Sequence, residues 1–286
     1  MEIKPAQVKE LRERTGVGMM DCKKALVEAN GDIDEAAELL RKAGQAKADK
    51  KSGRIAAEGR IIIADSGAAH AIVEINAETD FVANDDNFLG FAETVGQTLV
   101  SRKPADVAAL MALAVDGRSL EEARTELVAK IGENISVRRF ELIESAARVG
   151  SYVHMNRIGV IVEVEGGSDE LARDIAMQIA ATSPQFVSVD DVPEDVRAKE
   201  REILTAQAAQ EGKPPEIVAK MIEGRMRKHF DEVTLLGQPY VKNPDQKVRD
   251  LLKGAGATVK RFVRYAVGEG IDKKQENLAD EVRKLQ

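Results

Sequence analysis

The stretch Ala71-Ile72-Val73-Glu74-Ile75-Asn76 runs directly into Ala77-Glu78-Thr79-Asp80-Phe81-Val82-Ala83, where a strand pattern stops and a helical pattern begins. The first part is rich in β-branched residues, which is typical of a strand. Beyond it, Asp85-Asp86-Asn87 suits a helix N-terminus. Apolar residues then recur at helical spacing, at Phe88, Phe91, Val95 and Leu99. Phe81 therefore lies on a connection between a strand and a helix.

Phe81 is unusual at such a position because only 3% of the residues in this chain are aromatic, and this one is flanked by carboxylates. Two interpretations remain open from the residues alone. Phe81 could fold back over the core as a hydrophobic staple, with Thr79 or Asp80 capping the helix. Alternatively, its side chain points outward and binds a partner.

The strand pattern occurs twice, because Ala71-Ile72-Val73-Glu74-Ile75 is nearly repeated by Val160-Ile161-Val162-Glu163-Val164, and each copy precedes an amphipathic helix. Further strand candidates frame each copy, at 60–64 and 135–142 in the first and at 150–154 and 258–267 in the second. Short connections favour antiparallel pairing. The chain is therefore predicted to be α+β, with a core of two related subdomains.

The connection after the second copy differs from the first. Beyond Glu165 it reads Gly166-Gly167-Ser168-Asp169-Glu170, without an aromatic residue. A side chain needed for packing should recur in both copies. The asymmetry modestly favours a binding role for Phe81.

Residues 1–45 carry three short helical patterns. The first begins at Pro5, which suits a first helical turn, the second begins at about Met19, and the third ends before Gly44. So small a unit can bury little core, so it is predicted to be a docking module. Adjacent methionines cannot both face one core, so one of Met19 and Met20 should pack inward while the other offers a flexible apolar contact.

The remaining segments are assigned from composition. Residues 46–54 form a polar tract without an apolar stripe and are predicted to be a linker. Between 190 and 233 a charged helical pattern is interrupted by Glu211-Gly212-Lys213-Pro214-Pro215, which favours an antiparallel helical hairpin inserted in the second subdomain. A last helical segment is predicted from about Ile271. The predicted boundaries are 1–45 for the small helical domain, 46–54 for the linker, 55–143 for the first subdomain, 144–189 and 234–268 for the second, 190–233 for the hairpin and 269–286 for the C-terminal helical module.

Composition limits the class of protein. The 286 residues are 43% hydrophobic and 32% charged, with a net charge of -7 and a pI near 5.3, which indicates a soluble globular protein with a protein partner rather than a nucleic-acid binder. The single cysteine, Cys22, fits a reducing compartment. No signal peptide and no membrane span are recognisable, so a cytoplasmic location is predicted.

Catalytic and metal-binding patterns are weak. The histidines, His70, His154 and His229, lie far apart in the sequence without ligand-like spacing, and Cys22 has no obvious base. Asp80, Asp85 and Asp86 lack the glycine and final glutamate of a calcium loop. Gly16 and Gly18 have no preceding strand and no following lysine with serine or threonine, so they are a turn rather than a nucleotide loop. No metal, cofactor or covalent chemistry is predicted.

Two strings resemble the elongation factor Ts family. Glu78-Thr79-Asp80-Phe81-Val82 is similar to its Thr-Asp-Phe-Val signature, and Thr15-Gly16-Val17-Gly18-Met19-Met20-Asp21-Cys22-Lys23-Lys24-Ala25-Leu26 is similar to its amino-terminal motif. The resemblance extends over essentially the entire chain. It implies a small domain like the ubiquitin-associated (UBA) domain, a duplicated core, the coiled-coil hairpin of the long bacterial form, and a C-terminal helical module.

The resemblance also implies a function, the release of GDP from the GTPase elongation factor Tu without covalent chemistry. Thr79, Asp80, Phe81 and Val82 would intrude into the GTPase and displace its Mg²⁺. Arg12, Met19 and Met20 would take part in amino-terminal docking. The implied partner is elongation factor Tu, GDP-bound and nucleotide-free, with no cofactor, no direct nucleic-acid contact and no membrane. The alternative is a non-catalytic adaptor or RNA-associated module built on the UBA-like domain, although the net acidity counts against RNA binding.

Overall fold

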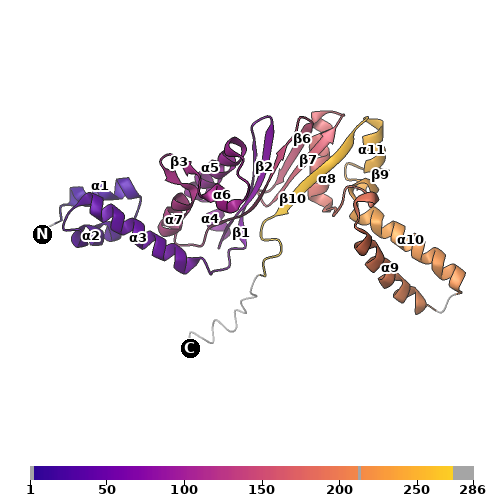
Figure 1. Cartoon of the computed structure of the whole chain (residues 1–286), viewed down its shortest axis with the longest axis horizontal. Helices are drawn as coiled ribbons and strands as arrows, with labels where there is room; N and C mark the ends of the chain where they lie inside the picture. Colours follow the sequence, from indigo (N-terminus) through magenta and orange to yellow (C-terminus); the bar gives the residue numbers. More distant parts are fainter. Residues whose placement is uncertain (1–2, 212–213, 273–286) are drawn as a thin grey trace. The chain divides into compact units, whose positions relative to one another are not determined.

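The computed structural model describes residues 3–211 and 214–272 and mixes helices with small sheets, so the predicted α+β class is confirmed (Figure 1). The chain divides into two compact units. Of the described residues, the first unit contains 3–66, 71–142 and 265–272, and the second contains 67–70, 143–211 and 214–264. Within the described ranges, every helix is too short or too polar to cross a lipid bilayer.

The first unit begins with three helices, α1 (Pro5–Thr15), α2 (Met19–Glu28) and α3 (Ile33–Lys51). Pro5 is the first residue of α1, where its missing N–H costs no helical hydrogen bond. Gly16 ends that helix with a left-handed φ of 67°, and the Asp32 carboxylate caps α3 by accepting from the backbone N–H groups of Asp34 and Glu35. The small core of these helices consists of Val8, Leu11, Cys22, Ala25, Leu26, Ala29 and Ala36.

The third helix is longer than predicted. Its expected end before Gly44 is wrong, because α3 continues to Lys51 and includes most of the tract assigned as a linker. Gly44 and Ala48 are buried, and a Cβ at Gly44 would lie 3.4 Å from the Cβ of Ala129 on α7 (Leu120–Ile131). Glycine and alanine at i and i+4 allow two helices to approach closely, but they form no stripe of large apolar residues. The sequence pattern therefore carries no sign of this buried face.

The first unit contains the sheet β1 (Glu58–Asp65), β2 (Ala69–Ala77) and β5 (Ser136–Glu144), with β2 in the middle. All nine residues of β2 are buried. After β2 come α4 (Asp80–Ala83) and α5 (Asp86–Arg102), and α5 packs on β1. The hairpin β3 (Ala114–Val115) and β4 (Arg118–Ser119) lies between α6 (Val107–Met111) and α7. The strands predicted at 60–64, 71–76 and 135–142 are confirmed.

The second unit repeats this arrangement. Its sheet has the order β10 (Thr258–Ala266), β7 (Ile158–Glu165), β6 (Arg148–His154), so the second strand of the set is again central. β6 and β7 pair antiparallel from Arg148↔Val164 to His154↔Ile158, as predicted. α8 (Asp169–Thr182) follows the central strand and packs on β6 and β7. The duplicated strand pattern therefore corresponds to a duplicated topology.

Between α8 and β10 the second unit carries the predicted helical pair, α9 (Glu194–Ala209) and α10 (Pro215–Val233), which projects from the sheet layer of this unit (Figure 1). Val192, Leu204, Met226 and Phe230 form a small apolar cluster that joins the two helices. The connecting elements are η1 (Val189–Asp191), η2 (Leu235–Gly237), β8 (Pro239–Tyr240), β9 (Asn243–Lys247) and α11 (Val248–Gly254). The C-terminal helix predicted from Ile271 lies almost entirely outside the described residues.

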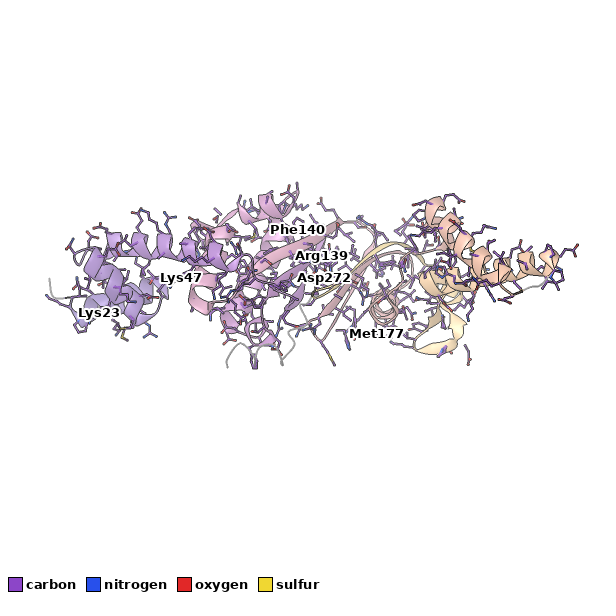
Figure 2. The ribbon with its side chains drawn as sticks, turned by 90° about the horizontal axis from the view of Figure 1, so that it is seen from below. Lys23, Lys47, Arg139, Phe140, Met177 and Asp272 are labelled. Atoms are coloured by element: carbon purple, nitrogen blue, oxygen red, sulfur yellow. The ribbon has the colours of Figure 1, made fainter. Side chains whose placement is uncertain are left out.

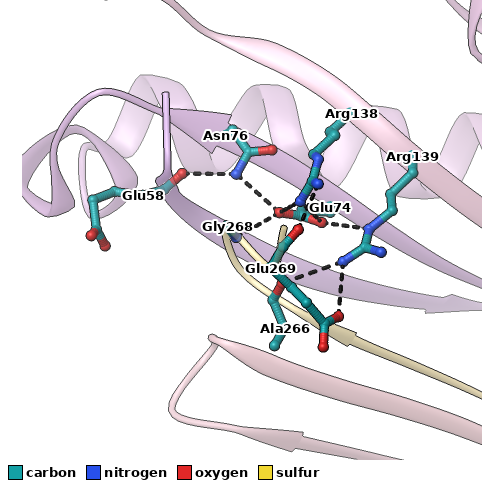
Figure 3. A network of polar contacts seen from close by, with 8 residues as sticks. All are labelled: Glu58, Glu74, Asn76, Arg138, Arg139, Ala266, Gly268 and Glu269. Carbon is teal, nitrogen blue, oxygen red and sulfur yellow. Dashed lines mark hydrogen bonds and ion pairs between the residues drawn. The ribbon is translucent and has the colours of Figure 1, made fainter. Parts of the chain in front are cut away.

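A buried carboxylate holds the chain after β10 against the first sheet (Figure 3). The Glu74 side chain on β2 is fully buried and accepts hydrogen bonds from Gly268 N (2.8 Å), Asn76 Nδ2 (3.0 Å), Arg139 Nε (2.6 Å) and Arg138 Nη1 (3.1 Å). Burial alone would raise the pKa of Glu74, but these four donors outweigh it and leave the pKa below its ordinary value.

Gly268 suits this contact for two reasons. Its φ is +73°, and a Cβ would lie 2.3 Å from the carbonyl oxygen of Ala57. Only a residue without a side chain lets the backbone N–H approach the Glu74 carboxylate here. Glu74, in the middle of β2, thereby joins the strand that leads to Phe81 to the chain after β10.

Candidate partner-binding site

The connection between β2 and α5 forms a rigid projection, here called the tip and comprising residues 79–83. Thr79 has extended backbone angles and its hydroxyl accepts a hydrogen bond from Val82 N (3.3 Å), which caps the four-residue helix α4. So short a helix is not stable by itself, because helix nucleation is unfavourable. Its conformation must therefore come from the contacts at its two ends.

The side chains of the tip point in two directions, some toward solvent and some toward the core. Phe81 is 84% exposed and Asp80 is exposed, whereas Val82 and Ala83 are 9% and 4% exposed. The interpretation of Phe81 as a hydrophobic staple is therefore wrong. Of the two helix caps considered, Thr79 and Asp80, the structure has Thr79 in that role. Val82, grouped with Phe81 in the signature, points inward and anchors the tip.

An arginine on β1 holds the C-terminal end of the tip. Arg60 donates from Nε to Ala83 O (2.7 Å) and from Nη2 to Asn84 Oδ1 (2.6 Å), and Asn84 Nδ2 donates to Asp80 O (2.7 Å). Asp85 then caps α5 by accepting from the side chain and backbone of Asn87, and these hydrogen bonds lower the pKa of Asp85. The tip thus presents Phe81 on a backbone that is bonded on both sides.

A second exposed apolar surface lies on α2. Met19, Met20 and Val27 are 59%, 65% and 57% exposed, so the expectation that one methionine packs inward is wrong. The buried stripe of α2 starts at Cys22, and the helix begins at Met19, so its first residues extend beyond the three-helix core. A groove on this face is lined by Met20, Lys23, Lys24, Val27 and Glu28.

Charged residues lie on α2 and on the two helices that pack against it. Lys23 lies on α2 and Lys47 on α3, where Lys47 pairs with Asp21 at 3.1 Å (Figure 2). Arg12, predicted with Met19 and Met20 as a docking residue, is exposed on α1. The structure therefore leaves all three predicted docking residues accessible.

The structure brings together no constellation typical of catalysis in the described part of the chain. His70 is buried on β2, His154 stacks on Tyr152 on β6, and His229 lies on α10 near Glu200. Cys22 is buried with its thiol directed to Val17 O at 3.5 Å. No group of three or more His, Cys, Asp or Glu among residues 3–211 and 214–272 could hold a metal ion.

Sequence reasoning missed the residues that support the tip, notably Arg60, Glu133 and Asn134. Each is polar and lies on a strand or turn remote from the signature. The sequence pattern carried no sign that the Glu133 carboxylate accepts hydrogen bonds from Thr79 or that the Asn134 backbone N–H donates to Glu78. A long-range pairing of this kind has no local periodicity, so only the folded chain reveals it.

This α+β scaffold holds exposed apolar side chains on a hydrogen-bonded backbone, which is typical of a protein that binds another macromolecule. The family model for Elongation factor TS matches residues 78–269. The chain is 59% identical over 286 residues to Elongation factor Ts of Thioalkalivibrio sulfidiphilus, which covers 99% of this chain and 98% of that protein. It is 57% identical over 284 residues to the protein of the same name from Halorhodospira halophila, and 58% over 285 residues to that from Alkalilimnicola ehrlichii, again covering 99% of this chain and 98% of each relative. The chain belongs to the elongation factor Ts family, whose members are translation elongation factors.

Proposed function

We propose that this chain is a guanine nucleotide exchange factor that binds GDP-bound elongation factor Tu and accelerates the release of GDP. Membership of the elongation factor Ts family supports this proposal. The observation that carries it is Phe81, which is 84% exposed on a tip whose backbone is hydrogen-bonded at both ends. In this proposal Asp80 and Phe81 enter the GTPase and the resulting shift displaces its Mg²⁺. No bond is made or broken.

Thermodynamic linkage gives the mechanism. A factor that binds the nucleotide-free GTPase more tightly than the GDP-bound form must weaken GDP binding by the same ratio. Burial of one phenylalanine contributes only about 1.5–3 kcal/mol. A shift from 1:99 to 99:1 needs about 5.5 kcal/mol. Other surfaces must therefore also bind the two states differently.

The exposed face of α2 is the candidate for docking. Met19, Met20 and Arg12 all remain accessible, and methionine adapts to a partner surface because its side chain is flexible. Docking through this module would raise the local concentration of the tip at the GTPase. The proposal also places this chain in the cytoplasm, which its single cysteine, Cys22, supports, since a reducing compartment does not favour disulfides.

The same face of α2 favours one alternative, an adaptor that binds a protein without catalysing exchange. Release of a fluorescent GDP analogue from elongation factor Tu, measured with and without this chain, separates the two functions. Acceleration that saturates with concentration supports an exchange factor. Complex formation without acceleration identifies an adaptor and overturns the proposal.

A further inference from the structure

Two segments distant in sequence interlock at the base of the tip. Thr79 donates to Glu133 twice, from its backbone N to Oε2 (3.0 Å) and from Oγ1 to Oε1 (2.8 Å). In the opposite direction, Asn134 N donates to Glu78 Oε1 (2.7 Å). Each segment therefore contributes a carboxylate that accepts from the backbone of the other, and the end of β2 is joined to the turn after α7.

The carboxylate of Glu133 also sets the direction of the Thr79 hydroxyl. Carboxylate oxygens only accept, so Oγ1 must donate its proton to Glu133. A lone pair of Oγ1 is then free to accept from Val82 N, and this bond caps α4. Because the same carboxylate also accepts from the Thr79 backbone N–H, Glu133 holds both the backbone and the hydroxyl of the residue that caps the turn carrying Phe81.

Glu133 is better suited to a test than its neighbour Asn134. The Asn134 side chain also donates to the carbonyl oxygens of Arg54 (2.8 Å) and Ser52 (3.3 Å), so its replacement would disturb the chain that follows α3. Within residues 3–211 and 214–272, the hydrogen bonds of the Glu133 carboxylate go to Thr79.

We propose that Glu133 is a positioning residue for nucleotide exchange: without touching the GTPase, it orients Thr79 so that Asp80 and Phe81 project in the productive direction. This inference rests on the proposed exchange function. It assigns a role to a residue outside the Thr-Asp-Phe-Val signature and remote from it in sequence.

The test uses Glu133→Gln in the full chain. The two side chains have nearly the same shape, but glutamine places an NH₂ donor where Thr79 needs an acceptor. Loss of about one hydrogen bond at the tip should lower the maximal rate of GDP release from elongation factor Tu by about tenfold. The concentration for half-maximal release should change by less than about twofold, because the docking surfaces are intact.

Two controls separate positioning from a general effect. Glu93→Gln removes one exposed carboxylate from α5 of the same unit and should leave GDP release unchanged. In a background that carries both Asp80→Ala and Phe81→Ala, Glu133→Gln should cause no further loss, since it acts through the orientation of these two residues. A further loss in that combined variant would overturn the proposal, as would an unchanged rate in Glu133→Gln.

Amide hydrogen exchange supplies a readout that does not need the GTPase. Glu133→Gln should reduce the protection of Val82 N–H, whose acceptor is the Thr79 hydroxyl, while the core strands stay protected. If Glu133→Gln does not fold, Thr79→Val is the substitute, because it removes the hydroxyl that Glu133 orients. It should both slow GDP release and reduce the protection of Val82 N–H. Normal Val82 protection refutes the positioning role. If the wild-type chain does not accelerate GDP release, the proposed nucleotide-exchange function is refuted instead, whatever the hydrogen-exchange protection of Val82 N–H shows.

Discussion

The two copies of the repeat use the same connection in different ways. Thr79 and Ser168 occupy matching positions after the two central strands, and each hydroxyl accepts from the backbone N–H three residues later, from Val82 at 3.3 Å and from Leu171 at 3.2 Å. Between the capping residue and the residue whose N–H it accepts from, the first copy has Asp80-Phe81 and the second has Asp169-Glu170. Both Phe81 and Glu170 are exposed.

The approach to the cap differs between the copies. In the second copy it is a glycine turn pressed against the backbone just before β10, since a Cβ at Gly166 would lie 2.2 Å from Gly256 O. In the first copy Glu78 and Thr79 are held by side-chain hydrogen bonds to the turn after α7. The comparison teaches that the capped turn is a folding feature common to both copies, whereas the exposed residue that it presents is free to be selected for binding.

The largest effect should come from the residue that distinguishes the copies. Phe81→Ala should lower maximal GDP release by roughly 10-fold to 150-fold, which corresponds to loss of the ~1.5–3 kcal/mol that burial of one phenylalanine contributes. The thermal melting temperature should change little, because the side chain is already exposed. Stopped-flow GDP release and calorimetry of the same samples measure the two quantities.

Two further variants control the Phe81 experiment. Asp80→Ala should share the defect, whereas Asp86→Ala, an exposed acid outside the tip, should not. A buried phenylalanine cut to alanine usually costs about 3–5 kcal/mol of folding stability. A loss of that size with GDP release preserved in the folded fraction would return Phe81 to a packing role.

The next effect concerns matching glutamates on the two central strands. Glu74 is fully buried, whereas Glu163 is 17% exposed and accepts from Ser145 Oγ (2.5 Å) and Arg261 Nε (3.0 Å). At pH 7, Glu74→Gln should lower the free energy of unfolding by about 2–3 kcal/mol. This is less than the loss expected for a fully buried ion pair, because both arginines are partly exposed. Glu163→Gln should cost about 1 kcal/mol or less.

The stability cost should also depend on pH. Hydrogen bonds overcome burial to lower the pKa of Glu74, and the Ser145 hydroxyl, followed by Arg261, lowers that of Glu163. Each carboxylate therefore stabilises the folded chain when the pH is above 4.5, its ordinary pKa. This stabilisation is lost as the pH falls through the lower pKa of the folded state. Urea unfolding from pH 7 to acid should show the wild type converging on each variant. A cost independent of pH would mean that shape, not charge, is responsible.

A smaller effect is expected at the glycine turn of the second copy. Gly166→Ala should destabilise the chain by about 1–3 kcal/mol, because φ is +74° and the new Cβ meets backbone. Gly256→Ala is the matched control, since its φ of +59° strains an alanine but no atom lies within 4 Å of the Cβ. Thermal unfolding should rank Gly166→Ala as the more damaging. Equal costs would show that the close approach relaxes freely.

The smallest effect tests whether the position itself confers binding. Glu170→Phe places an aromatic residue at the site that matches Phe81, and because Glu170 is exposed, the stability should change by less than about 0.5 kcal/mol. GDP release should not increase. A gain in release would mean that the second copy also reaches the nucleotide-binding region of the GTPase, and the division of roles between the copies would need revision.

The sequence by itself determined the features that depend on neighbours a few residues apart. The β-branched run in Ala71-Ile72-Val73-Glu74-Ile75 and its repeat at 160–164 predicted both central strands. Thr79 was one of two candidate helix caps, beside Asp80, because a cap accepts from a backbone N–H only a few residues away. The composition of the second connection, with two glycines and no aromatic residue, is enough to indicate that the copies differ in what they present.

The tertiary structure alone decided which way side chains point and what supports them. The direction of Phe81, the burial of Val82 and the exposure of both Met19 and Met20 depend on neighbours that no local period encodes. Glu74 meets Gly268, and Thr79 meets Glu133, across long separations in the sequence, since hydrogen bonds require proximity in space and not along the chain. The extension of α3 to Lys51 has the same cause: Gly44 and Ala48 form a helix contact whose favourable energy comes from α7, which the sequence of α3 does not contain.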